Sequence, residues 1–90
     1  MTERKEQLEE EVKFAQMGQQ VVNNDAYKQA LIARKAKLFD VFCNTKPEEG
    51  EIREEAWRTM KNLKALEDYL TQVLTTGKMA EQSLSQTNKH

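Results

Sequence analysis

Apolar and polar residues follow one another along this chain with helical spacing, and the pattern predicts three helices. The first predicted helix covers residues 2–22, and its opening turns are rich in glutamate, which favours the positive end of a helix dipole. Its apolar stripe consists of Leu8, Val12, Ala15 and Val22. Asn23, Asn24 and Asp25 then interrupt the pattern, and these residue types favour helix N-caps. We therefore expect a corner and a new helix from about Ala26, with one bent helix as the alternative.

The second and third predicted helices cover residues 26–43 and 51–76. Proline and glycine mark residues 44–50 between them as a loop. The buried side of the second helix is expected to carry Tyr27, Ala30, Leu31, Leu38, Val41 and Phe42. The strongest periodic signal in the chain is the stripe of the third helix, formed by Ile52, Ala56, Leu63, Leu66, Leu70 and Val73.

The third helix is expected to end near Gly77, which would take the left-handed conformation of a helix cap. A short turn over residues 79–84 and a mobile polar tail over residues 85–90 complete the prediction. The fold class is therefore all-α, with a three-helix up-down arrangement in a single domain over residues 1–84. The short loop makes helices two and three an antiparallel hairpin. Helix one either packs across this hairpin or extends away from it.

Composition narrows the class of protein. The chain has 90 residues, of which 38% are hydrophobic and 32% charged, with a net charge of −1. This length supports one small core, so the monomer would be marginally stable and self-association into a homo-oligomer is expected. The start of the chain resembles no signal peptide, and no apolar run is long enough to cross a membrane. A cytoplasmic protein without membrane contact is predicted.

The sequence shows no arrangement of residues that would make an enzyme. His90, the one histidine, lies at the end of the expected tail. Cys43, the one cysteine, cannot form an intrachain disulfide and is interpreted as a small buried hydrophobe beside Phe42. Glutamates cluster in several places, but consecutive residues of a helix point in different directions, so a solvated charged face is favoured over a metal site. No catalytic residue, metal or cofactor is predicted.

Partner binding is predicted instead, and Trp57 and Met60 are the leading contact residues. They lie at the edge of the third helix stripe, where core and surface meet, and Arg58 flanks them. Burial in the core is the simpler explanation for this pair. Arg34 interrupts the apolar stripe of helix two, where it would either pair across an interface or extend its stem to reach water.

Basic residues raise nucleic-acid binding as an alternative. Arg34, Lys35 and Lys37 cluster on helix two, and Arg58, Lys61 and Lys64 recur every three residues on helix three. Such groups could contact phosphates with little sequence preference. Intrahelical charge pairing, for example between Glu54 and Arg58, accounts for much of the same pattern. Nucleic acid is therefore the less favoured partner.

Between about Val12 and Leu84 the chain resembles small helical proteins encoded by tailed bacteriophages. The resemblance rests on Phe14-Ala15 through the break at residues 23–25, the run Arg53-Glu54-Glu55-Ala56-Trp57, the leucine-spaced residues 63–70 and Thr76-Gly77-Lys78-Met79-Ala80. Where these proteins often have Asp-Pro, this chain has Asn23-Asn24-Asp25. The resemblance implies a protein of the host cytoplasm or the virion that helps to assemble a particle.

We therefore expect a non-enzymatic assembly or adaptor protein, with a virion component or morphogenesis factor as its specific form. Two alternatives stay open. One is a nucleic-acid-binding or regulatory protein, and the other is a small inhibitor of a host enzyme.

Overall fold

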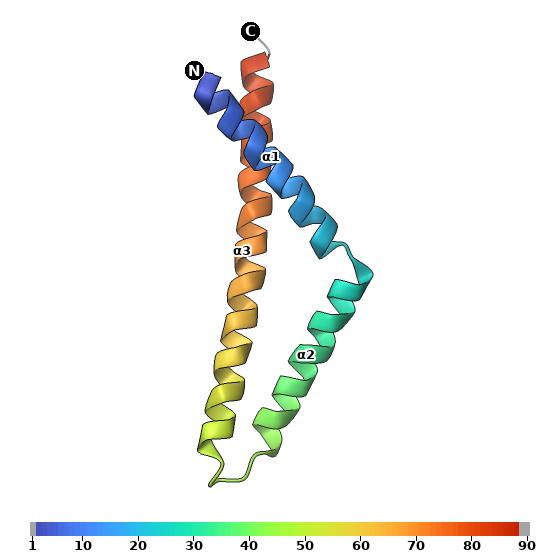
Figure 1. Ribbon diagram of the computed structural model, residues 1–90, viewed down its shortest axis with the longest axis vertical. Helices are drawn as coiled ribbons and strands as arrows, with labels where there is room; N and C mark the ends of the chain where they lie inside the picture. Colours follow the sequence, from blue (N-terminus) through green and yellow to red (C-terminus); the bar gives the residue numbers. More distant parts are fainter. Residues whose placement is uncertain (1, 89–90) are drawn as a thin grey trace. The chain divides into compact units, whose positions relative to one another are not determined.

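The structure, a computed structural model, describes residues 2–88, and this part of the chain forms three α-helices joined by short connections (Figure 1). The helices are α1 (Thr2–Val22), α2 (Asp25–Asn44) and α3 (Gly50–Asn88). The predicted all-α class is confirmed. Contacts group the chain into two compact units, α1 with α3 from Asp68 onward, and α2 with α3 up to Glu67.

The unit formed by α2 and the first part of α3 is the predicted antiparallel hairpin. Asn24 caps α2, since its side-chain oxygen accepts a hydrogen bond from the backbone N–H of Tyr27 at 2.9 Å. Leu38 and Ala56, at equal distances from the middle of the loop, are buried. Phe42 and Ile52, also at equal distances from it, are 39% and 44% exposed. The core of this unit is therefore narrow.

Arg53 holds the loop over residues 45–49. Its guanidinium donates hydrogen bonds to the Thr45 hydroxyl at 3.2 Å, to the backbone carbonyl of Pro47 at 3.2 Å, and to the carbonyl of Lys46. The backbone N–H of Lys46 donates to the Glu49 carboxylate at 2.8 Å. One arginine thus satisfies several carbonyl and hydroxyl acceptors at the turn, which fixes where α3 begins.

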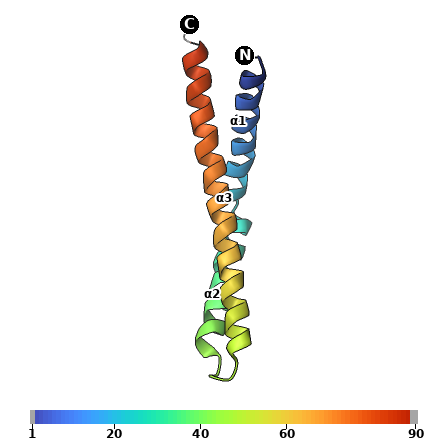
Figure 2. The same ribbon diagram turned by 90° about the vertical axis from the view of Figure 1, so that its left-hand side faces the viewer.

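In the second unit, α1 packs antiparallel against the later part of α3 (Figures 1 and 2). The closest approach is at Gly77, where an added Cβ would overlap the Cβ of Ala15 and lie 3.4 Å from the Glu11 carbonyl oxygen. Gly18 of α1 is buried near Val73. Small residues at the crossing let the two backbones approach closely.

The prediction that Gly77 ends the third helix is wrong. No described glycine has a positive φ, and Gly77 lies inside α3, which continues to Asn88. The separate turn over residues 79–84 is likewise part of this helix. Residues 85–88, expected to begin a mobile tail, are helical, and residues 89–90 lie outside the described residues. The physical reason is that α1 packs on Gly77, so the glycine serves a close helix contact and not a chain reversal.

Helix one was expected to cover the hairpin or to extend away from it, and this choice stays a prediction. Helix one packs on the extension of α3 beyond residue 68 that the sequence pattern did not predict in full. The predicted bounds of α1 are confirmed, and those of α2 are extended by one residue at each end. The single domain over residues 1–84 stays a prediction.

Candidate partner-binding surfaces

Trp57 lies on the surface of the hairpin. It is 50% exposed, one residue after buried Ala56. The Lys61 ammonium lies 5.3 Å from the centre of its ring, in cation–π geometry one turn further along α3. Burial in the core, the simpler explanation at the sequence level, is therefore wrong for Trp57. Half of a large amphipathic ring remains available for contact.

A second exposed apolar stripe runs along α2. Ile32 and Phe39 are 68% and 62% exposed, and Ala36 and Cys43 on the same stripe are also exposed. The spacings of four, three and four residues are those of a coiled-coil seam. The interpretation of Cys43 as buried is therefore wrong, because its helix turns it away from α3. This stripe has coiled-coil spacing, and its members remain exposed within the hairpin.

The exposed residues of α2 and α3 share one side of the hairpin. Successive residues of an α-helix are rotated by about 100° around its axis. Phe39 and Trp57 each follow a buried residue by one position, so both are rotated in the same sense away from the contact between α2 and α3. In an antiparallel pair such positions lie on the same side. The ion pair between Lys35 and Glu67, with nitrogen and oxygen 2.7 Å apart, links the helices there. We call this surface the hairpin flank; it comprises Lys28, Ile32, Lys35, Phe39, Trp57 and Lys61.

Exposed apolar residues also mark α1. Phe14, Met17 and Val21 are 49%, 61% and 43% exposed. Helix geometry places each of them at least about 100° around α1 from Ala15. The same line continues toward the N-terminus with glutamates, all exposed. We call the whole line the α1 outer stripe; its members, three or four residues apart, are Glu3, Glu6, Glu10, Phe14, Met17 and Val21.

The predicted partner-binding residues do not form one group. Met60 is half-buried beside Trp57, whereas Arg58 is exposed and pairs with Glu54 at 3.1 Å, as the intrahelical explanation predicted. Arg34 is exposed and lies on the opposite side of Leu38 from Phe39. The hairpin flank thus contains one of the four residues, Trp57, with Met60 at its inner edge.

The predicted basic cluster is also divided between the two sides of the hairpin. Lys35 and Lys61 lie on the hairpin flank, with Lys35 paired to Glu67 and Lys61 over Trp57. Lys37 lies on the other side of α2, with Arg34. Lys64, one turn beyond Lys61, is exposed but has its own interaction within the chain. The lysines therefore accompany apolar side chains and do not form a continuous basic stripe.

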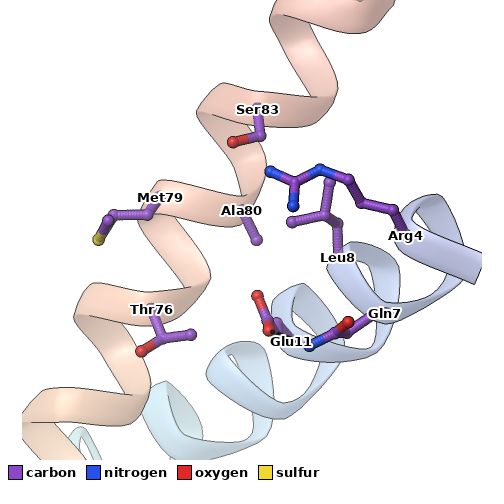
Figure 3. A pocket seen from close by; sticks show the side chains of 8 residues that line it. All are labelled: Arg4, Gln7, Leu8, Glu11, Thr76, Met79, Ala80 and Ser83. Carbon is purple, nitrogen blue, oxygen red and sulfur yellow. Dashed lines mark hydrogen bonds between the residues drawn. The ribbon is translucent and has the colours of Figure 1, made fainter. Parts of the chain in front are cut away.

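A cleft of about 260 Å³ opens between α1 and α3 (Figure 3). Its walls include Arg4 and Glu11 from α1 and Ala80 and Ser83 from α3. Leu8 and buried Ala80 form its apolar floor, and Gln7 donates a long hydrogen bond of 3.4 Å to Glu11. The cleft therefore combines polar walls that carry both signs of charge with an apolar floor.

Two further features bear on chemistry and location. Across residues 2–88, no group of three or more histidine, cysteine, aspartate or glutamate side chains is placed to hold a metal ion. Within the same residues, none of the helices combines the length and apolarity needed to cross a bilayer. His90 lies outside the described residues.

No protein-family model, curated protein or solved structure matches this chain. The resemblance to helical phage proteins therefore stays a prediction. The exposed stripe of α2 was missed at the sequence level, although its signal was present. Ile32, Phe39 and Cys43 follow a heptad spacing of their own, displaced from the stripe that packs on α3.

Proposed function

We propose that this protein is a non-enzymatic assembly or adaptor protein that works by binding other proteins through its exposed apolar surfaces. The observation that carries the proposal is the number of large apolar side chains that remain exposed. Four apolar residues are fully buried in the described chain, Leu38, Ala56, Val73 and Ala80, and the other residues of the predicted stripes are half-buried or exposed. Eleven larger apolar side chains are exposed, from Phe14 on α1 to Met79 on α3.

Scattered exposed apolar residues are common on monomeric proteins, but lines of them at helical spacing are typical of surfaces that bind another helix. The hairpin flank and the α1 outer stripe are two such lines. Both combine large apolar side chains with charged ones, mainly basic on the flank and mainly acidic on α1, which favours selective over non-specific binding. The resemblance to phage proteins supports a specific form of this role, a virion component or morphogenesis factor acting in the host cytoplasm or in the particle.

Nucleic-acid binding has less support as an alternative. The basic residues are divided between two sides of the hairpin, and the net charge of the chain is −1. If the alternative holds, affinity for a generic duplex will fall steeply with salt, and charge removal at Lys35, Lys37, Lys61 or Lys64 will weaken it. Enzyme inhibition, the remaining alternative, would appear as a stoichiometric complex with one host enzyme.

The test is the molar mass of the purified chain by light scattering, combined with affinity capture from host lysate. We expect either a self-associated species or a captured protein, and loss of that species when Phe39 and Trp57 are both replaced by alanine. The matched control replaces Ile52 and Leu66, which are 44% and 49% exposed on the other side of the hairpin. A monomer that captures no protein would refute the proposal.

A further inference from the structure

We propose that α1 of one copy of this chain docks on the hairpin flank of a second copy. This inference rests on the proposed function and names the partner, a second copy, and the surface that it uses. Each copy carries both halves of the contact, so the assembly is either a closed pair with two such contacts or a longer chain of copies.

Charge complementarity is the first argument. The members of the α1 outer stripe include three glutamates, and exposed Lys13 borders them between Glu10 and Met17. The hairpin flank carries Lys28, Lys35 and Lys61 among its apolar side chains, and Lys35 is already paired with Glu67. An acidic surface attracts a basic one, and two acidic surfaces repel each other. α1 would therefore bind the flank in preference to α1 of another copy.

Spacing is the second argument. In α1 each acid precedes an apolar residue by eleven positions, as in Glu6 and Met17. In α2, Lys28 precedes Phe39 by the same eleven positions. Eleven residues make about three turns and about 16 Å of helix, so both pairs lie on one face at equal separation. When Glu6 lies over Lys28, Met17 therefore lies over Phe39.

This match fixes the direction and register of the docked helix. α1 of the second copy runs parallel to α2, with Glu6 over Lys28, Glu10 over Ile32 and its apolar half near the loop end of the hairpin. Phe14, Met17 and Val21 then cover Phe39 and Trp57. Val21 follows Met17 by four residues, and Cys43, the one cysteine of the chain, follows Phe39 by four. The register therefore brings Val21 close to Cys43.

The first experiment exchanges charges across the contact. Glu6→Lys with Glu10→Lys, and separately Lys28→Glu with Lys61→Glu, should each raise the self-dissociation constant at least tenfold. Mixing the two variants should restore association, because the charge-reversed α1 of one variant then meets the charge-reversed flank of the other. The control, Lys37→Glu with Arg58→Glu, makes the same charge change outside the flank and should leave association unchanged. High salt should weaken the wild-type complex.

The second experiment tests the register. A chain carrying Val21→Cys and Cys43→Ser is mixed with wild-type chain under mild oxidation. A disulfide-linked heterodimer is expected, and a chain carrying Glu6→Cys and Cys43→Ser should give far less. Circular dichroism of each variant confirms that it is folded.

The results separate this contact from the wider proposal. An oligomer that survives the flank reversals, or that cross-links equally through both engineered cysteines, overturns docking of α1 on the flank and leaves self-assembly through another face. A wild-type chain that stays monomeric also overturns it. If that monomer captures a foreign protein, the proposed function stands without this contact, and if it captures none, both fail.

Discussion

Gly77 lies where the backbones of α1 and α3 come closest. A methyl group at this position would overlap Ala15, whereas one at Gly18 would meet Val73 at 3.6 Å, an ordinary contact distance. The two glycines therefore differ in what they do, although both lie inside helices where alanine is intrinsically preferred.

Gly77→Ala should lower the free energy of unfolding by about 1–3 kcal/mol, because the helices must separate to admit the side chain. Gly18→Ala is the control and should be neutral or stabilising by up to about 1 kcal/mol, since helix propensity improves without a clash. Urea unfolding followed by circular dichroism measures both. Equal effects of the two substitutions would contradict the close contact at Gly77.

The hydroxyl of Tyr27 is inaccessible to solvent and has no hydrogen-bond partner among the described residues. A buried hydroxyl without a partner costs free energy, so Tyr27→Phe should leave the stability unchanged or raise it by about 1 kcal/mol. Thermal unfolding of the two proteins at equal concentration measures this. A clear loss of stability would mean that the hydroxyl has a partner in solution.

At the scale of elements, α3 is the helix on which both other helices pack. Its first part packs with α2 and its later part with α1. Residues 77–88, which the sequence pattern assigned to a cap, a turn and a tail, include Gly77, on which α1 packs, and buried Ala80.

Ending the chain after Thr76 should therefore unfold α1 as well as remove the end of α3. The loss of helical signal should exceed that expected for the deleted residues, because an isolated helix of this length is marginal in water. Ending the chain after Gln86 is the control and should change little. Circular dichroism at equal molar concentration gives the comparison, and a loss proportional to the deleted residues would show that α1 is helical without α3.

At the scale of the whole molecule, the main feature is how little apolar surface is buried. Each large side chain buried stabilises a fold by about 1.5–3 kcal/mol before entropy is counted, and few are buried here. A partner that covers Phe39 and Trp57 would therefore add to the stability of the fold as well as form a complex.

If the partner is a second copy, the unfolding temperature should rise with protein concentration, because association stabilises only the folded state. Scanning calorimetry over two decades of concentration measures the effect. The variant with alanine at Phe39 and Trp57 is the control and should unfold at a temperature that does not depend on concentration. A constant unfolding temperature for the wild type would argue against a second copy as the partner.

The sequence by itself determined the helical class, the bounds of α1, a helix cap within residues 23–25 and the loop before α3. These features depend on local physics, namely apolar spacing, the hydrogen-bonding preference of asparagine, and the backbone limits of proline and glycine. The pairing of Arg58 with Glu54 could be predicted for the same reason, since residues four apart on a helix are neighbours.

Only the tertiary structure decided the role of Gly77, the length of α3 and the exposure of Trp57 and Phe39. A glycine in a sequence is compatible with a helix end and with a close helix crossing, and only the presence of Ala15 opposite it distinguishes the two. Apolar spacing likewise shows which residues share a stripe, but whether a stripe is buried depends on which helix packs against it. Trp57 and Phe39 lie beside their stripes, at the side of the hairpin that no helix of their own unit covers.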